Sequence, residues 1–213
     1  MKMSPLLNKF LEKLQSAISQ KIDEASGIDI GRLRTILAVD SAYRNDELMV
    51  TVGVLWDLEK NQATGQSYII SRPTYEYVPG LLFMREAPSI VELVEKIDSG
   101  WDLLMVDGHG LLHPRKAGLA VMVGITVDKP TIGIAKKLLV GEEVGEGYMG
   151  PVYLNGQLLG YWFKDRSRFY ASPGYKVSIE DIPVIVNLLG GRYPEAMKLA
   201  DRLARKKIKE INC

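Results

Sequence analysis

Two short apolar runs, separated by a helix-sized segment, constrain the fold of this chain more than any other feature. The runs are Leu103 to Val106 and Thr131 to Ala135, and a helix is predicted between them from about Lys116 to Val123. Strands and helices that alternate at this spacing form crossover units, and crossover units connect parallel strands. The middle of the chain therefore predicts an α/β fold with parallel strands in its sheet.

The segment before these runs predicts antiparallel pairing instead. Three β-rich runs follow one another, and a three-residue turn, the length of a hairpin loop, separates the first two. A second hairpin is predicted within residues 152–163, because Asn155-Gly156 is a strong turn signal. The predicted fold class is thus α/β with a mixed sheet, in which an antiparallel three-strand meander is extended by two parallel strands and flanked by helices. The meander strands are predicted at Arg34 to Tyr43, Glu47 to Trp56 and Gly65 to Ser71.

Four further helices are predicted from capping residues. Ser4-Pro5 combines an N-cap with a proline at the first helical position, and Pro88 is predicted to begin a second helix in the same way. Ser178 with Asp181 three residues later opens a third, and Pro194 opens the last. The first helix is expected to bury an apolar face, because these residues recur at helical spacing: Leu7, Phe10, Leu11, Leu14, Ile18 and Ile22.

Composition limits the class of protein. The chain has 213 residues, of which 46% are hydrophobic and 25% charged, as in an ordinary soluble globular protein. We expect one domain over residues 1–213, a monomer located in the cytoplasm. No apolar run approaches the roughly 18 residues that span a bilayer, and Lys9 and Glu12 interrupt the first apolar stretch, so neither a membrane association nor a signal peptide is expected. The single cysteine, Cys213, excludes a disulfide framework. The net charge of +1 fits a local basic patch better than a surface that coats long nucleic acid.

Three carboxylates are candidates for a metal site. Asp40 stands inside an apolar strand, where an isolated charge is costly unless it is paired or binds a metal. Asp107 ends the next apolar strand, and ligands of open α/β sheets lie at the carboxyl ends of strands. Glu86 is the natural third member, and three such groups would suit Mg²⁺. The alternatives are pairing of Asp40 with an arginine and a favourable charge at a helix N-terminus for Glu86.

Other segments contain residues that could take part in catalysis or binding. His109 and His113 have zinc-ligand spacing on a helix, but nearby glycines and Pro114 argue against a helix there. They are either two exposed histidines or titratable groups beside a metal-bound phosphate. The loop of residues 75–80 is aromatic and stiffened by proline, so it is either a turn with a packed tyrosine or a wedge that enters a base stack. Lys136, after the strand that ends at Ala135, is either solvated or faces a phosphate.

Five segments in order resemble the endonuclease V family, the deoxyinosine-directed repair nucleases. They are AVDSAY (38–43), YVPGLLFMREAP (77–88), DGHGLLHPRKAGLA (107–120), GIAKKLL (133–139) and ASPGY (171–175). The resemblance implies a ribonuclease H-like fold and hydrolysis of the second phosphodiester 3′ to deoxyinosine in DNA, which leaves 3′-hydroxyl and 5′-phosphate ends. It also implies Mg²⁺ as cofactor, for which Mn²⁺ would substitute.

The same resemblance assigns roles to residues. Asp40 and Asp107 would hold the metal, with Glu86 completing the acidic cluster, and His113 and Lys136 would lie beside the scissile phosphate. The wedge that fills the gap left by a displaced base would be Tyr77, Val78 and Pro79. The pocket for the hypoxanthine base would be lined by Gly80, Leu82, Gly108, Gly110 and Ala135.

Two departures and three alternatives remain open at this point. Glu76 precedes the wedge, and Tyr175 stands where many bacterial members have histidine. An inosine-directed ribonuclease of the same fold would carry the same segments, because 2′-hydroxyl contacts depend on pocket geometry. A catalytically silent nucleic-acid-binding module is a second alternative, which the intact carboxylates oppose. A zinc-binding regulator that uses His109 and His113 is the third, and it lacks cysteine partners.

Overall fold

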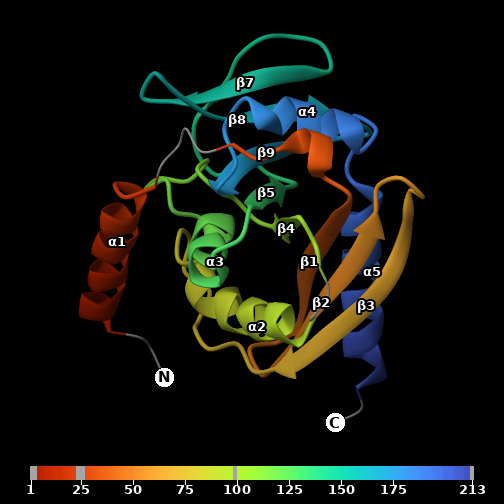
Figure 1. Cartoon of the computed structure of the whole chain (residues 1–213). Helices are drawn as coiled ribbons and strands as arrows, with labels where there is room; N and C mark the ends of the chain where they lie inside the picture. The colour runs from red at the N-terminus through yellow and green to blue at the C-terminus, as the bar shows by residue number, and fades with distance from the viewer. Residues whose placement is uncertain (1–3, 23–26, 98–99, 212–213) are drawn as a thin grey trace.

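The computed structural model describes residues 4–22, 27–97 and 100–211. In this part of the chain one mixed sheet of nine strands runs through the molecule in the order β3-β2-β1-β4-β5-β9-β8-β7-β6 (Figure 1). The strands are β1 (Thr35–Arg44), β2 (Leu48–Asp57), β3 (Gln62–Ser71), β4 (Leu103–Asp107), β5 (Thr131–Ala135), β6 (Glu142–Glu143), β7 (Met149–Leu154), β8 (Gln157–Lys164) and β9 (Arg168–Tyr175). The helices are α1 (Pro5–Ser19), the 3₁₀ turn η1 (Ile30–Arg32), α2 (Leu82–Lys96), α3 (Leu119–Val127), α4 (Asp181–Leu188) and α5 (Glu195–Glu210).

The predicted fold class is confirmed. β1, β2 and β3 form the antiparallel meander, and β1 is followed in the sheet by the parallel strands β4 and β5. The sequence analysis missed β9, which contains the ASPGY segment and pairs antiparallel with β5. That pairing joins the predicted hairpin of β7 and β8 to the rest of the sheet.

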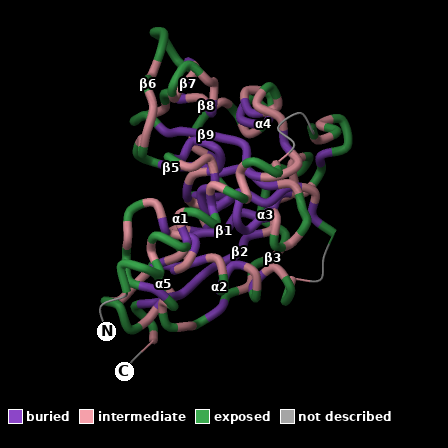
Figure 2. The backbone as a smooth tube through the Cα atoms, turned by 90° about the vertical axis from the view of Figure 1, so that its left-hand side faces the viewer, coloured by how far each residue is buried: buried purple, intermediate pink, exposed green. Residues whose placement is uncertain are grey.

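Helices cover both faces of the central strands. Alternate residues of β1 point to opposite faces, so Leu37 and Val39 pack in one core cluster while Ile36 and Ala38 pack in another. The first cluster includes residues of α2 and α3, and the second includes residues of α4 and α5. Figure 1 shows α2 and α3 on one side of β1 and β4 and α5 on the other. Figure 2 shows the central strands buried and the β6–β7 end of the sheet mostly exposed.

The second helix begins earlier than predicted. α2 starts at Leu82, so Pro88 lies inside the helix and does not open it. A proline has no N–H to donate to the carbonyl four residues before it. That carbonyl belongs to Met84, and the hydroxyl of Thr74 donates to it instead. The helix therefore continues through Pro88, and Glu86 sits in its middle and not at its N-terminus.

The first helix also differs from expectation. α1 has the predicted cap, in which the Ser4 hydroxyl accepts from the amide of Leu6. Its apolar face is not buried as predicted, since Leu7, Phe10 and Leu14 stay at least 36% exposed. The helix instead contacts the protein along one edge of that face, where Leu11 and Gln15 are the buried residues. Helical spacing identifies an amphipathic helix but does not say which edge of its face meets the core.

The remaining helix predictions hold with shifted bounds. α3 begins at Leu119 and not near Lys116, because Lys116 takes a positive φ of 49° in the preceding loop. Ser178 and Asp181 form the predicted capping box, in which each side chain accepts from the other residue's amide. α5 begins directly after Pro194. None of the helices in the described ranges is long and apolar enough to cross a membrane.

Candidate active site

Asp40 and Asp107 lie next to each other at the point where the parallel pairing of β1 and β4 ends. Val39 of β1 pairs with Val106 of β4, so the two aspartates occupy the next position on each strand. Side chains alternate along a strand, so both carboxylates are on the face that Ala38 and Met105 share with α5. The register of the β1–β4 pair therefore brings together two carboxylates that are far apart in sequence.

The environment of Asp40 disfavours its charge. Asp40 is only 5% exposed. Burial, as the larger cause, and repulsion from Asp107, as the next, raise the pKa of Asp40 to about 9. The amide of Ser41 donates to Oδ1 at 2.6 Å, whereas Oδ2 is buried without a hydrogen-bond partner among the described residues. Burial also raises the pKa of Asp107, although the nearby ammonium of Lys136 partly offsets this. A pair of buried carboxylates in this state lacks the positive charge that would stabilise both as anions.

Three further residues complete this side of the sheet, and we call the set Asp40, Asp107, Lys136, Tyr193 and Asp201 the acidic edge. Lys136 Nζ lies 4.0 Å from Asp107 Oδ2 and 3.7 Å from Asp201 Oδ1. Asp201 is not predictable from sequence, because on the charged face of α5 nothing distinguishes it from its neighbours in an amphipathic pattern. Tyr193 also carries no sequence signal, and its buried hydroxyl has no hydrogen-bond partner within the described residues.

The acidic edge fits a hard divalent cation as an incomplete site. In the described ranges, no three His, Cys, Asp or Glu side chains converge as a preformed ligand group. Mg²⁺, however, is commonly held by one or two carboxylates, with water and substrate phosphate supplying the other oxygens. The orphaned Oδ2 of Asp40 and the mutual repulsion of Asp40 and Asp107 are what a cation would relieve. The donors are all oxygens, which favours Mg²⁺ or Mn²⁺ over zinc.

Glu86 lies on the other face of the sheet, close enough to Asp107 for their charges to interact. Its carboxylate accepts a 2.5 Å hydrogen bond from the hydroxyl of Tyr43. The guanidinium of Arg85 lies over the ring of the same tyrosine, 4.4 Å from the ring centre. Burial, together with the charge of Asp107, raises the pKa of Glu86 to about 8 although the Tyr43 hydrogen bond opposes this. Glu86 is thus electrostatically linked to Asp107 but anchored in a separate network.

A cavity of about 280 Å³ lies on the α2–α3 side of the same edge, and we call it the Gly80 cavity. It contains three of the five residues predicted for the base pocket, Gly80, Leu82 and Gly108, and the exposed Tyr77 lies at its border. Gly110 and Ala135 do not line it. A Cβ on Gly110 would stand 1.9 Å from the carbonyl oxygen of Pro173, so this glycine lets the loop pack against β9.

His113 and Arg115 hold Gly80 in place. Gly80 has a φ of 81°, and its carbonyl accepts from His113 Nε2 at 3.1 Å and from Arg115 Nη2 at 2.8 Å. His113 Nδ1 accepts from the amide of Arg115, so the ring is neutral with its proton on Nε2. Burial lowers the pKa of His113 to about 4. The predicted phosphate-side histidine therefore has both ring nitrogens engaged in positioning the loop, and it lines the Gly80 cavity.

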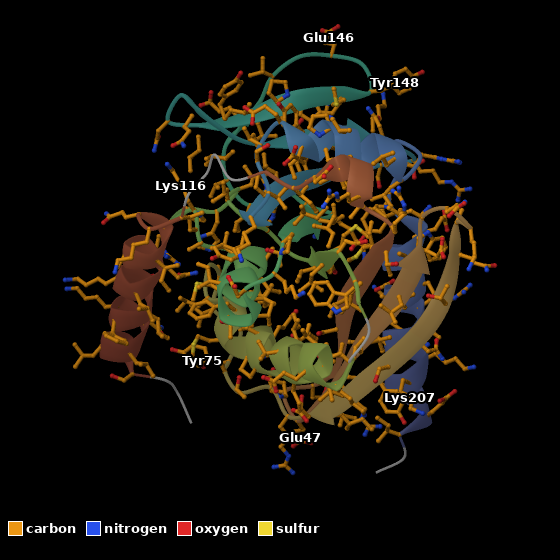
Figure 3. The ribbon with its side chains drawn as sticks, viewed as in Figure 1. Glu47, Tyr75, Lys116, Glu146, Tyr148 and Lys207 are labelled. Atoms are coloured by element: carbon orange, nitrogen blue, oxygen red, sulfur yellow. The ribbon has the colours of Figure 1, made fainter. Side chains whose placement is uncertain are left out.

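The two tyrosines of the 75–80 loop have opposite environments. Tyr77 is 67% exposed, followed by half-buried Val78 and exposed Pro79, so the packed-tyrosine alternative does not apply to Tyr77. Tyr75 is the packed one, 4% exposed, and its hydroxyl donates to Asn8 of α1. Figure 3 shows Tyr75 between α1 and the α2–α3 pair. The carbonyl of Tyr75 also accepts from Arg85, so the base of the loop is fixed, whereas the side chain of Tyr77 is exposed.

Of the remaining candidates, His109 lines the Gly80 cavity and Tyr175 lies away from it. His109 Nε2 is 3.0 Å from the carbonyl of Lys137, and burial lowers its pKa to about 4, so it does not join His113 in a zinc pair. Tyr175 pairs with Thr131 at the start of β5, whereas the acidic edge adjoins the end of that strand. Its hydroxyl donates to Asp128 at 3.2 Å. Tyr175 thus lies at the opposite end of the central strands from Asp40.

Known proteins resemble this chain over nearly its whole length. The family model for endonuclease V matches residues 13–202. Endonuclease V from Saccharolobus solfataricus is 41% identical over 96% of this chain and 98% of its own, and that from Sulfolobus acidocaldarius is 37% identical over 95% and 97%. Among solved structures, endonuclease V from Ciona intestinalis, in complex with a 24mer DNA containing an inosine followed by a ribo-adenosine, superimposes with a TM-score of 0.89 at 20% identity, covering 98% of this chain and 100% of that one. The catalytic domain of human endonuclease V gives 0.85 at 21% identity, covering 98% of both chains.

These likenesses agree with the geometry. The chain has a ribonuclease H-like mixed sheet with two carboxylates paired on its central strands. This arrangement places it in the class of nucleic-acid-cleaving enzymes with that fold. Within that class, the chain belongs to the endonuclease V family.

Proposed function

We propose that this protein is a DNA repair endonuclease that recognises deoxyinosine and hydrolyses the second phosphodiester bond on its 3′ side. The observation that carries the proposal is the placement of the Gly80 cavity and the acidic edge on the two sides of one sheet edge. A base held in the cavity leaves its strand within reach of the carboxylates. Hypoxanthine pairs weakly, so its removal from the stack costs less than that of a normal base.

Recognition in this proposal is the work of the Gly80 cavity and the wedge. The clamped carbonyl of Gly80 and the backbone around Gly108 present fixed polar groups at the cavity wall. Tyr77, supported by Val78 and Pro79, fills the gap in the duplex, since its ring already projects into solvent. Gly110 and Ala135 contribute by packing, because they set the positions of the loop and of β5 without lining the cavity.

Cleavage in this proposal is the work of the acidic edge. Asp40 and Asp107 would hold a Mg²⁺ ion, for which Mn²⁺ would substitute, and Asp201 and Glu86 would add negative charge beside it. When bound there, such an ion would polarise the phosphoryl oxygen, activate a water and neutralise the leaving oxygen. Lys136 faces the scissile phosphate between Asp107 and Asp201. His113 acts as a positioning residue for Gly80 and not as a proton-transfer group, because both ring nitrogens are occupied.

A second candidate is an inosine-directed ribonuclease with the same residues. The DNA bound to the Ciona intestinalis relative carries a ribo-adenosine directly after the inosine, so a ribose near the cleavage point is compatible with the family's fold. A ribonuclease would need to contact the 2′-hydroxyl, which distinguishes RNA from DNA at a given position.

One assay tests the proposal against both alternatives. Matched inosine-containing DNA and RNA oligonucleotides are incubated with the protein, with and without Mg²⁺, and the product ends are mapped. We expect metal-dependent cleavage of DNA one nucleotide beyond the inosine, with 5′-phosphate on the downstream product. Preferential cleavage of RNA would favour the ribonuclease. Binding without cleavage under every condition would overturn the enzymatic proposal.

A further inference from the structure

A second cavity, of about 470 Å³, opens on the α5 side of the acidic edge. It is formed by Lys136, by the turn between β8 and β9, and by the chain that enters α5 from Arg192 onward. We call it the arginine groove, after Arg166 of the turn and Arg192 before the helix. Asp201 and Tyr193 of the acidic edge line its inner end.

The arginine groove and the Gly80 cavity lie on opposite sides of the end of β5. Lys136 lines the groove and the next residue, Lys137, lines the cavity. Both residues lie in the bend directly after β5, so the two hollows are separated by a single residue along the chain. The carboxylates of Asp40 and Asp107 lie at the same end of the strands, on the α5 face and therefore on the groove's side.

The charge of the groove is positive where it is open. Arg166 and Arg192 are both exposed, and neither has an ion pair or a hydrogen bond among the residues that the structure describes. The other cations at the groove are engaged, Arg168 with Glu143 and Lys198 with Glu195 and Asp165. In a chain with a net charge of only +1, two unpaired guanidinium groups beside one cavity are a local anion-binding surface.

An orphaned hydroxyl marks the inner end of the groove. The Tyr193 hydroxyl is buried and has no hydrogen-bond partner within the described ranges, and Lys136 Nζ lies 5.5 Å from the centre of its ring. Buried hydroxyls are normally hydrogen-bonded, so the Tyr193 hydroxyl is available to donate to an acceptor from a ligand. A phosphate oxygen at the acidic edge would accept from it.

We propose that the arginine groove binds the strand on the 3′ side of the scissile bond, through its phosphates. This inference rests on the proposed function, because that function sets the polarity. With the inosine base in the Gly80 cavity and the scissile phosphate at the acidic edge, the chain that continues 3′ leaves on the far side of the carboxylates. Arg166 and Arg192 then neutralise the phosphates that follow, which positions the strand without reading its bases.

The test varies the length of the strand on each side of the inosine. Two DNA substrates carry about three or about twelve nucleotides 3′ to inosine with the same 5′ arm, and a third shortens the 5′ arm instead. The variant is R166A/R192A, and the matched control is R32A/K129A, which removes two positive charges at the opposite edge of the sheet. Both arginines of the variant are exposed, so its melting temperature should equal that of the wild type.

We expect the variant to lose about 10-fold in kcat/KM on the long 3′ arm and less than about 2-fold on the short one, with the control unchanged. Fluorescence anisotropy without divalent metal should give the same pattern in affinity, and its salt slope should become shallower by about 0.9 per lost contact. Equal losses on both 3′ lengths, or a loss that follows the 5′ arm, would overturn the groove assignment. A wild type that binds with this pattern but shows no inosine-dependent cleavage would instead overturn the proposed function and keep the groove.

Discussion

The two sides of the β1–β4–β5 edge differ in how complete they are. On the Gly80 side the polar groups are satisfied, since Gly80, His113, Arg115 and Gln15 form one connected set of hydrogen bonds. On the acidic edge, Asp40 Oδ2 and the Tyr193 hydroxyl are buried without partners among the described residues. Under the proposed function, the difference separates a preorganised recognition surface from a site that is completed only when a cation and a phosphate bind.

The energetic consequence is opposite for the two sides. A satisfied network rigidifies the loop that carries the wedge, so a base meets a wall that does not need to reorganise. Unpaired carboxylates cost stability in the metal-free protein, and that cost is relieved when a cation binds. Four predictions test this contrast, from the largest effect to the smallest.

Replacing either central aspartate tests the acidic edge. Asp40→Ala and Asp107→Ala should each reduce cleavage of inosine-containing DNA by more than about 100-fold, since even outer partners of metal ligands cost 10–100-fold. Circular dichroism should show an unchanged fold, because the metal-free site is not a stabilising network. Product formation on a denaturing gel at saturating Mg²⁺ is the measurement.

Stability measurements supply the control for these variants. The raised pKa of Asp40, about 9, means that the folded metal-free protein holds a proton that the unfolded chain has lost above pH 4. Stability therefore falls as pH rises toward 9, and Asp40→Asn should melt at a higher temperature than the wild type at pH 8 without metal. As a control, Glu59→Gln, at an exposed carboxylate, should change neither the cleavage rate nor the melting temperature. Wild-type turnover by Asp40→Ala or Asp107→Ala would contradict the metal assignment.

Acid should weaken the Gly80 side. The pKa of His113 is lowered by burial to about 4, below the 6.5 of the unfolded chain, so between these values the unfolded chain binds the additional proton. Stability contributed by neutral His113 is present above pH 6.5 and is lost as pH falls toward 4, by up to about 3 kcal/mol.

The variant His113→Gln isolates this effect, because an amide can still donate to the carbonyl of Gly80 but does not titrate. Urea unfolding at several pH values between 4 and 7 should show a steeper loss for the wild type than for the variant. Parallel curves for the two proteins would show that His113 is not the titrating group.

The wedge loop offers a matched pair of tyrosines. Tyr77→Ala should weaken binding to inosine-containing duplex by about 1–3 kcal/mol, the value of a lost stacking contact, with less effect on single strands. Its melting temperature should not change, because the ring is 67% exposed. Tyr75→Ala should do the reverse and lower stability by about 3–5 kcal/mol, since Tyr75 is buried. If Tyr75→Ala kept the wild-type stability and Tyr77→Ala lost stability, Tyr77 would be the packed tyrosine and the wedge assignment would be wrong.

The smallest effect concerns salt. Each phosphate contact contributes about −0.9 to the slope of log affinity against log salt concentration, and the chain has a net charge of only +1. We expect a slope shallower than about −6, measured by anisotropy between 50 and 200 mM salt. A slope near −10 would require a basic surface much larger than the arginine groove.

Local patterns in the sequence determined much of this protein. The apolar runs at Leu103 to Val106 and Thr131 to Ala135, the meander and the Asn155-Gly156 hairpin predicted the mixed sheet, because strand and turn signals are short-range. The long motifs around Asp40, Tyr77 and Asp107 identified the family and most of the candidate site. Residues whose chemistry is unusual for their local context, such as a carboxylate in an apolar strand, are visible in sequence alone.

Only the tertiary structure decided which groups meet. Asp201 and Tyr193 join the acidic edge because α5 packs on the face of β1 that carries Asp40, and no local pattern encodes that contact. Helical spacing predicted a buried face on α1, but Phe10 remained 60% exposed, since burial depends on what packs against a helix. The proline pattern predicts a helix start at Pro88, yet the hydroxyl of Thr74, from the loop before α2, donates to the carbonyl that the proline leaves unpaired. Long-range packing supplies partners, and partners decide both burial and chemistry.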